Sequence, residues 1–260
     1  MLVAVDIGNS SITLGLFDGY ELLNKRMVNT SSVLTGKEWI NNISDLVQSS
    51  GDRSIQGCII SSVVPDLTEP VSSVLSNLTG ITALVLGRDI APEISFDVLK
   101  PEEVGHDRIA NVVGAFRIYG DPAIVVDFGT ATTVSIIRDR TFIGGTIMPG
   151  LEMMARALNA YTSRLPYVEI NSLIETKRDV KALGKDTSQN IISGIIYGSA
   201  GAIERIIQEI EASQSCRFVI VLTGGHSVII AKYLKRDFSL DPDLTLKGLR
   251  FIYEERECMN

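Results

Sequence analysis

A repeated strand and loop motif constrains this chain more than any other feature of its sequence. The first copy, residues 2–13, is an apolar β-branched run that ends in Asp6-Ile7-Gly8, and the second copy, residues 123–134, ends in Asp127-Phe128-Gly129. In each copy short polar residues and a second apolar run follow, which predicts a strand, a sharp loop and another strand. Two matched copies predict a duplicated chain with two similar halves.

Both loops have the residue types of a phosphate-binding site. Glycine lets the backbone approach a ligand closely, and backbone N–H groups beside short side-chain donors form a concave anion site. The short donors are Asn9, Ser10, Ser11, Thr130, Thr132 and Thr133. Because a bare carboxylate repels phosphate, Asp6 and Asp127 fit only if a cation lies between them and the ligand, as in phosphoryl transfer. The alternative is that each Asp-x-Gly is a turn after a buried strand.

Composition excludes several classes of function. A net charge of −7 with no cluster of Lys or Arg argues against a nucleic-acid surface. The apolar runs fall far short of the roughly 20 residues of a membrane span, and the first strand directly after Met1 leaves no room for a signal peptide. We expect a cytosolic protein that binds neither nucleic acid nor membrane. Its two histidines, His106 and His226, argue against a multi-histidine metal centre or a Ser-His-Asp triad. The apolar strand contexts of Cys58 and Cys216 predict core residues.

Strands and helices alternate along the chain, which predicts an α/β fold. Asp18-Gly19 between apolar runs predicts a hairpin, so the chain opens as a three-stranded antiparallel meander, and Thr35 with Glu38 forms a capping box before a helix. Further helices are expected over residues 67–78, 107–119 and 188–212 and from Gly150, Ser227 and Leu246, whereas residues 162–186 look irregular. Asp121-Pro122 marks the boundary between the halves.

A second group of chemically active residues is Gly105-His106-Asp107-Arg108, at the start of an expected helix. In a functional interpretation, Asp107 accepts a proton from a substrate hydroxyl and Arg108 binds a carboxylate or phosphate as a fork. The alternative is a helix cap with a surface ion pair. Thr223-Gly224-Gly225 also leaves two interpretations open, a turn into a helix or a close approach of backbone to a nucleoside.

In their order along the chain, these motifs resemble those of the type III pantothenate kinases, in the acetate and sugar kinase/Hsp70/actin superfamily. The motifs are Asp6-Ile7-Gly8-Asn9-Ser10-Ser11, Gly105-His106-Asp107-Arg108, Asp127-Phe128-Gly129-Thr130-Ala131-Thr132, Gly144-Gly145-Thr146-Ile147-Met148-Pro149-Gly150, Leu165-Pro166, Gly184-Lys185-Asp186-Thr187 and Thr223-Gly224-Gly225. The resemblance covers nearly the whole length. It implies two duplicated actin-like (ribonuclease H-like) domains, each a mixed sheet with helices on both faces. Residues 1–120 would hold the first phosphate loop, and residues 121–260 the second phosphate and cation loop with the dimerisation helices.

The resemblance also implies an activity, in which ATP and pantothenate give 4′-phosphopantothenate and ADP, the first step of coenzyme A synthesis. By similarity, Asp107 is the general base, Asp127 binds potassium or ammonium, and Mg²⁺ arrives with ATP. ATP contacts are implied for Asp6, Ile7, Gly8, Asn9, Ser10, Ser11, Ile12, Thr13 and Thr130, and pantothenate contacts for Val98, Gly105, His106, Asp107, Arg108 and Thr187. The family forms homodimers with the substrate pocket near the subunit interface, so Thr187 would act on the partner chain's pocket.

Two positions depart from the family pattern. Val98 stands where the family often carries Tyr, and His106 stands where a small residue, usually Ala, is common.

Two other functions are compatible with this kind of fold. One is a non-catalytic relative that acts as a regulator or partner-binding protein, and the other is a different kinase or phosphatase of the same superfamily. The latter predicts a phosphate site without the Gly-x-Asp-Arg loop. A binding module needs no base, so the combined presence of five residues argues against the regulator: Asp6, Asp107, Arg108, Asp127 and Thr187.

Overall fold

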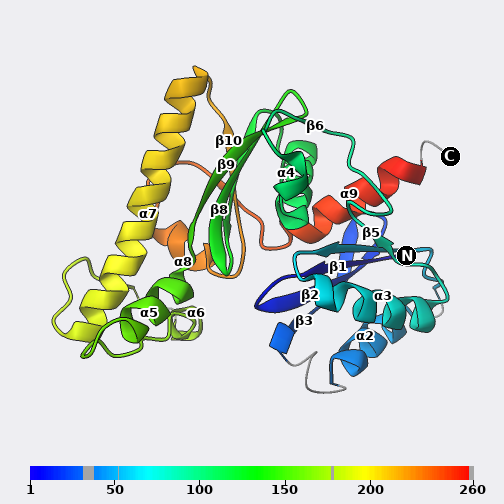
Figure 1. Ribbon diagram of the computed structural model, residues 1–260, viewed down its shortest axis with the longest axis horizontal. Coiled ribbons are helices and arrows are strands. Elements are labelled where there is room, and N and C mark those ends of the chain that lie inside the picture. Colours follow the sequence, from blue (N-terminus) through cyan, green and yellow to red (C-terminus); the bar gives the residue numbers. More distant parts are fainter. Residues whose placement is uncertain (32–37, 52, 177–178, 258–260) are drawn as a thin grey trace. The chain divides into compact units, whose positions relative to one another are not determined.

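The computed structural model of the chain describes residues 1–31, 38–51, 53–176 and 179–257 (Figure 1). It divides into two compact units. The first unit comprises Met1–Ile118, Arg140–Phe142 and Leu244–Asn260, and the second comprises Tyr119–Asp139 and Ile143–Asp243. The chain first passes from one unit to the other after Ile118, close to the expected boundary at residue 120. The C-terminal segment, however, groups with the first unit rather than with the second half. Thr35 of the expected capping box lies outside the described residues.

The first unit is built on a five-stranded sheet in the order β3-β2-β1-β4-β5. Its strands are β1 (Leu2–Ile7), β2 (Ser11–Asp18), β3 (Glu21–Asn29), β4 (Gly57–Ser62) and β5 (Leu84–Val85). The first three form the expected antiparallel meander, while β1, β4 and β5 are parallel. The hairpin turn is Gly19-Tyr20, one residue later than expected, because Asp18 still pairs with Glu21. This strand order is that of a ribonuclease H-like domain.

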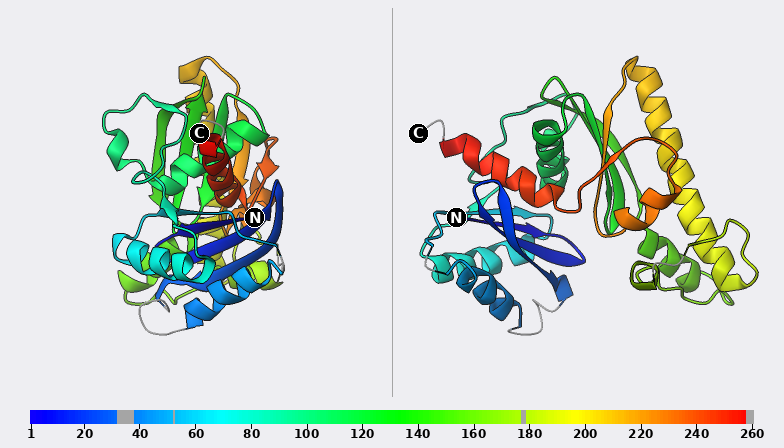
Figure 2. Two further views of the ribbon diagram at one scale, coloured as in Figure 1. Left: turned by 90° about the vertical axis from the view of Figure 1, so that its right-hand side faces the viewer. Right: turned by 180° about the vertical axis from the view of Figure 1, so that it is seen from behind.

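Helices cover both faces of this sheet (Figures 1 and 2). On one face α2 (Glu38–Gln48) and α3 (Pro65–Thr79) pack against the inward side chains of β1, which include Val3 and Val5. On the other face α4 (His106–Ile118) and α9 (Leu244–Glu257) pack against Leu2 and Ala4. Side chains alternate along a strand, so Asp6 lies on the face of Leu2 and Ala4. Asp6 therefore shares its face with α4.

The second unit repeats this sheet. Its strands are β7 (Ala123–Phe128), β8 (Ala131–Arg138), β9 (Thr141–Pro149), β10 (Val219–Thr223) and β11 (Ser239–Leu240), in the order β11-β10-β7-β8-β9. The short β6 (Ser95–Phe96) pairs with the start of β9. In β1 and β7 alike every residue is buried except the aspartate. The expected duplication into two actin-like domains is confirmed by this match of strand order and burial.

Helices of the second unit pack on the face of β7 that carries Ile124, Val126 and Phe128. They are α5 (Leu151–Ala160), α7 (Thr187–Gln214) and α8 (Ser227–Ile230), with α6 (Ser172–Thr176) inside the segment expected to be irregular. The described residues also include two short 3-10 helices, η1 (Pro101–Glu103) in the first unit and η2 (Ala231–Tyr233) in the second. Asp127 lies on the opposite face of β7 by strand alternation. Within the described part of the chain, no helix combines the length and apolar character that crossing a membrane requires.

Two glycines let α4 and α9 touch backbone to backbone. A Cβ added at Gly248 would lie 1.8 Å from the Ala110 carbonyl oxygen, and one added at Gly114 would lie 2.9 Å from the Leu244 carbonyl oxygen. Figure 2 shows the two helices crossing. No side chain fits at this crossing, so the glycines fix how α9 supports α4, whose first turn carries Asp107.

Replacing Gly248 by Ala should therefore lower the free energy of unfolding by about 1–3 kcal/mol, since an added methyl group must push the two backbones apart. Gly201→Ala is the matched control. Gly201 is an exposed α7 residue with nothing within 4 Å of an added Cβ, and this change should stabilise by about 0.4–1 kcal/mol. Urea unfolding measures both. Equal stability of Gly248→Ala and the wild type would contradict the close crossing.

Candidate active site

The first phosphate loop is closed by its own hydrogen bonds. The Gly8 N–H donates to the Ser11 carbonyl at 3.0 Å, and the Thr30 hydroxyl donates to the Gly8 carbonyl at 2.7 Å. The Gly8 N–H is thus already used, and Asn9 and Ser10 form the exposed tip of the loop. Ile7 and Ile12, both expected to contact ATP, have side chains buried in the core, so only their backbone can face a ligand.

Each loop aspartate lies between two hydroxyl residues. Asp6 is in register with Thr13 on β2 and with Ser61 on β4. Asp127 is likewise in register with Thr133 on β8 and with Thr223 on β10. Residues directly opposite each other on neighbouring strands point to the same face of the sheet. Each carboxylate is therefore flanked on both sides by hydroxyl groups.

The two loops differ in length by one residue. In the first hairpin Ile7 pairs with Ile12, whereas in the second Phe128 pairs with Thr132. The sequence match of Gly8 with Gly129 holds at the loop entrance, and the residues after it are offset by one.

Carboxylate and hydroxyl oxygens are the ligands that hard cations prefer, so both aspartates suit a cation that accompanies phosphate. In the residues that the structure describes, no three His, Cys, Asp or Glu side chains come together as a metal-binding group. One carboxylate with two hydroxyls fits a cation that also takes ligands from the nucleotide and from water, rather than one enclosed by protein.

Three glycines shape the second loop. The Gly129 N–H donates to the Ala131 carbonyl, and the Gly150 N–H donates to the Thr130 carbonyl, both at 3.1 Å. A Cβ at Gly224, whose φ is 86°, would lie 2.3 Å from Oδ1 of Asp127. Thr223-Gly224-Gly225 thus forms a turn from β10 towards α8, and its backbone approaches the Asp127 loop itself.

The segment Gly105 to Arg108 is called the acceptor loop here, because the resemblance implies that it contacts pantothenate, the phosphoryl acceptor. It is held at the end of β4, the strand that pairs with β1 and Asp6. Nδ1 of His106 donates to the Ser62 carbonyl, 3.3 Å away, at the end of β4. The His106 ring also packs on Gly87, where a Cβ would lie 2.2 Å from Nε2. Since α4 covers the face that carries Asp6, the structure brings Asp6, Ser61 and the acceptor loop together on one face of one sheet.

Asp107 is held close to the backbone at the start of α4. Its Oδ1 accepts a hydrogen bond from the Arg108 N–H at 2.8 Å, and a Cβ at Gly105 would lie 2.4 Å from the same oxygen. Burial raises the pKa of the Asp107 carboxyl above its usual value, while the neighbouring Arg108 and His106 lower it in part. A carboxylate with a raised pKa is a better proton acceptor near neutral pH. Gly105 accepts the first helical hydrogen bond, from Ile109, so Asp107 is not the cap residue.

Arg108 is oriented by an aromatic ring. Its guanidinium carbon lies 5.4 Å from the centre of the Phe142 ring, and Phe96 packs against Phe142 with the ring centres 6.0 Å apart. Burial lowers the pKa of the Arg108 guanidinium, against the opposing effect of Asp107. The side chains of Asp107 and Arg108 are partly buried, unlike those of an exposed surface ion pair.

Two further expected substrate contacts belong to other segments of the chain. Val98 is partly buried just after β6, and Thr187 is the exposed first residue of α7, in the second unit. The Asp186 carboxylate caps α7 by accepting from the Gln189 N–H at 2.8 Å. The structure places Asp6 and the Gly105 to Arg108 segment on one face of the first sheet. Ser61, which pairs with Asp6, was not predicted from sequence as a candidate site residue. It shares one signal with the two predicted loops, a hydroxyl residue at the end of an apolar strand.

The two described cysteines differ from each other. Cys58 is buried as expected, and burial raises the pKa of its thiol to about 11, so it is not a nucleophile at neutral pH. The sequence predicted that Cys216 is a core strand residue, and this prediction is wrong. It is partly buried after the end of α7, and its thiol donates to the Arg217 carbonyl at 3.2 Å.

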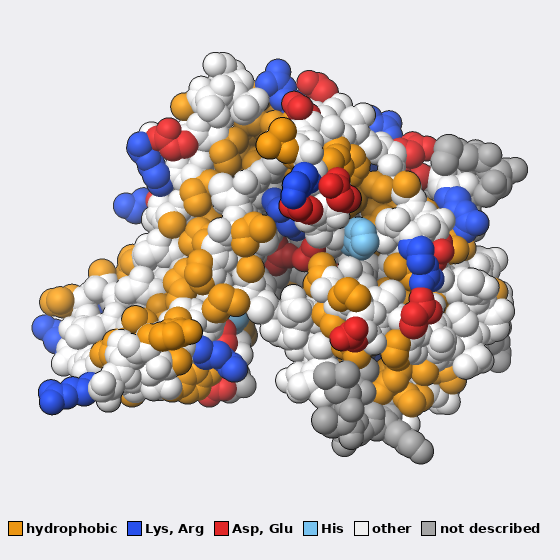
Figure 3. All heavy atoms as spheres, in the orientation of Figure 1, with side chains coloured by type: hydrophobic (Ala, Val, Ile, Leu, Met, Phe, Trp, Pro, Cys, Tyr) orange, Lys and Arg blue, Asp and Glu red, His pale blue; other side chains and the backbone are white. Residues whose placement is uncertain are grey.

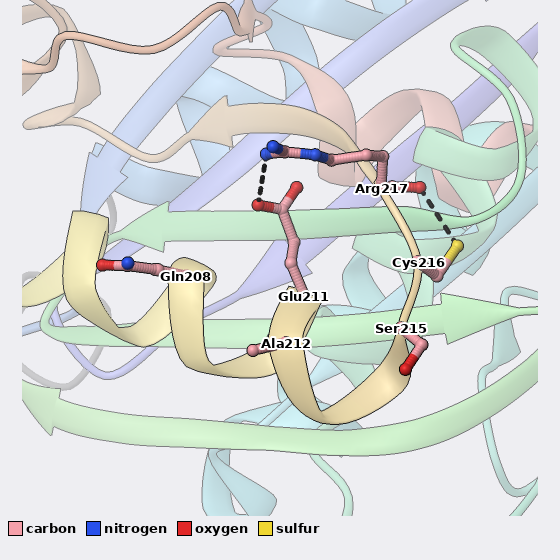
Figure 4. A pocket seen from close by; sticks show the side chains of 6 residues that line it. All are labelled: Gln208, Glu211, Ala212, Ser215, Cys216 and Arg217. Carbon is pink, nitrogen blue, oxygen red and sulfur yellow. Dashed lines mark hydrogen bonds and ion pairs between the residues drawn. The ribbon is translucent and has the colours of Figure 1, made fainter.

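Cys216 borders a hollow at the C-terminal end of α7 (Figure 4). The charged groups there are already paired, since the Glu211 carboxylate accepts from Arg217 at 3.0 Å and from Arg236 at 3.3 Å. Among the described residues, those that line this hollow include none of the predicted site residues.

Comparisons with known proteins show the family to which the chain belongs. A family model described as type III pantothenate kinase matches residues 2–209. A type III pantothenate kinase of Moorella thermoacetica is 37% identical over 98% of this chain and 99% of that protein, and one of Brevibacillus brevis is 36% identical over 99% and 100%.

A crystal structure from Campylobacter jejuni, described as a putative Baf family transcriptional activator, superposes with a TM-score of 0.62 at 20% identity, over 98% of this chain and 99% of that one. That likeness shows the fold alone. With full-length identity well above 30% and a family model that spans most of the residues, this chain belongs to the type III pantothenate kinase family.

Proposed function

We propose that this chain transfers the terminal phosphoryl group of ATP to pantothenate, giving 4′-phosphopantothenate and ADP in the first step of coenzyme A synthesis. Family membership supports this reaction. The observation that carries it is the anchoring of the acceptor loop at the Ser62 carbonyl, on the same sheet face as Asp6. A phosphate donor and an alcohol acceptor can thus meet within the first unit. No described contact favours the regulatory alternative.

In this reaction Asp107 takes the proton of the primary hydroxyl of pantothenate. Its raised pKa makes it a stronger base than an ordinary Asp. Arg108 binds the pantothenate carboxylate through its planar fork, and the Phe142 ring limits where that fork can point. Gly105 and His106 complete the acceptor loop, with Val98 and Thr187 as further pantothenate contacts.

The triphosphate of ATP binds along residues 6–13 and at Thr130, with Mg²⁺ near Asp6 and potassium or ammonium at Asp127. These cations neutralise the phosphate charge, which is most of what phosphoryl transfer requires besides positioning. The hydroxyl residues beside each aspartate fit such cations. We place the reaction in the cytosol.

A coupled assay tests the reaction directly. With Mg-ATP, pantothenate and potassium, the purified chain should release ADP in proportion to phosphopantothenate, and replacing potassium by sodium should slow turnover strongly. Ammonium should restore it. Absence of turnover with pantothenate and its analogues would contradict the proposal and favour a non-catalytic role.

Asp107→Asn should still bind Mg-ATP but turn over about 10²–10⁴-fold more slowly, as loss of a general base typically costs. In the wild type, kcat/KM should fall as the pH drops through the raised pKa of Asp107, at a pH above the ordinary Asp value of about 3.9. Full activity of Asp107→Asn would remove this residue from the role of base.

The same variant should not be destabilised at neutral pH. Because the Asp107 pKa is higher in the folded chain than in the unfolded one, the folded state binds more protons in the window between the two values. Stability is therefore present at low pH and is lost as the pH rises through this window. Asn cannot ionise, so Asp107→Asn should lose less stability than the wild type between acid and neutral pH. Thermal unfolding across this range measures the difference.

We propose that two copies of this chain pair through α5 and α7. An open groove of about 1030 Å³ between these helices is lined mostly by apolar side chains and also by Thr187. Hydrophobic side chains gather over α5 and the neighbouring part of α7 (Figure 3), and Tyr161 is 89% exposed. Burying this surface would stabilise a dimer, and Thr187 would then stand at the subunit interface.

Sedimentation velocity tests the pairing. The wild type should sediment with the mass of two chains, whereas Ala157→Arg should sediment as one, because it places a charge in the apolar groove. Ala212→Arg, an exposed position near the other end of α7, is the matched control and should stay paired. A wild type that sediments as one chain at micromolar concentration would contradict the dimer.

A further inference from the structure

The Ser61 hydroxyl is an unusual group in the first unit. Ser61 is 0% exposed, and its Oγ has no hydrogen-bond partner among the residues that the structure describes. A buried polar group without a partner is unfavourable and is uncommon in folded proteins. The neighbouring Ser62 shows the contrast, since its hydroxyl accepts from Thr68 at 2.8 Å and from the Val64 N–H at 3.2 Å.

The position of Ser61 connects the two parts of the site. It pairs with Asp6 across the parallel strands β1 and β4, which places the two side chains on one face, on strands about 4.8 Å apart. The next residue, Ser62, accepts the hydrogen bond that anchors His106. Ser61 therefore lies between the phosphate loop and the loop that carries Asp107.

The second unit has a hydroxyl residue at the equivalent position. Thr223 pairs with Asp127 across the parallel strands β7 and β10, as Ser61 pairs with Asp6. The duplicated sheet thus carries a hydroxyl beside the aspartate in both units, although the two strands have different sequences around it. This recurrence indicates a role in the site rather than in local packing.

We propose that Ser61 is a positioning residue for the phosphoryl group in transfer, and that its hydroxyl donates a hydrogen bond to the terminal phosphate of ATP bound at Asp6. The inference rests on the proposed kinase function. Phosphate oxygens are strong hydrogen-bond acceptors. For transfer, the terminal phosphate of ATP must approach the pantothenate hydroxyl beside Asp107. Rotation about the Cα–Cβ bond allows the hydroxyl to meet an acceptor that arrives with the ligand.

The test compares Ser61→Ala with the wild type in three measurements: melting temperature without ligand, affinity for Mg-ATP and affinity for Mg-ADP, all without pantothenate. The melting temperature should stay equal or rise, because the variant removes an unpaired buried hydroxyl. Mg-ATP should bind roughly threefold to tenfold more weakly, as expected for one lost hydrogen bond. Mg-ADP, which lacks the terminal phosphate, should bind as tightly as it does to the wild type.

Ser62→Ala is the matched control. It removes a hydroxyl that has protein partners but keeps the backbone carbonyl that binds His106. It should therefore lower the melting temperature and change the affinity for Mg-ATP by less than twofold. Equal weakening of ATP and ADP by Ser61→Ala, or no weakening of either, would overturn the inference. If the wild type itself turns over Mg-ATP and pantothenate, either result leaves the kinase function intact; failure of the wild type in that assay would instead refute the proposed function.

Discussion

The burial of the Asp107 carboxylate is the constraint on which the rest of the site depends. Burial disfavours the charged form of this carboxylate and so raises its pKa. A raised pKa suits the role of proton acceptor that we propose for Asp107, although burying a charged group costs free energy of folding. Several features hold it there: Gly105 leaves no side chain to displace it, the Arg108 N–H binds it, and His106 fixes its loop to β4. Farther away, the glycine contact between α4 and α9 supports the helix that carries it.

Duplication explains why the two halves share a plan and yet differ in detail. The same strand order and the same partly exposed aspartate between buried neighbours occur in both units. The surroundings of the two aspartates then diverge. In the first unit α4 brings the acceptor loop to the face of Asp6, whereas in the second unit Gly150 and Gly224 pack backbone against the Asp127 loop. One scaffold thus carries a matching aspartate in both units but different segments around it.

Local features of the structure could be predicted from sequence, and features that depend on long-range packing could not. Apolar alternation and Asp-x-Gly are local signals, so both hairpins and the start of α4 lie close to where they were expected. The membership of α9 in the first unit depends on contact with α4, which no local pattern records. The position of Ser61 beside Asp6 depends on the register between β1 and β4, which are separated by some fifty residues of sequence. Cys216 lies in a turn whose sequence resembled the start of a strand.

The central claim, that the carboxylate of Asp107 deprotonates an alcohol brought beside the phosphate loop of Asp6, is tested most directly by a crystal structure with pantothenate and a Mg²⁺-bound, non-hydrolysable ATP analogue. The account predicts the primary hydroxyl of pantothenate within hydrogen-bond distance of Asp107, with the pantothenate carboxylate on Arg108. A bound pantothenate whose hydroxyl lies out of reach of Asp107 and against a different basic group would contradict it.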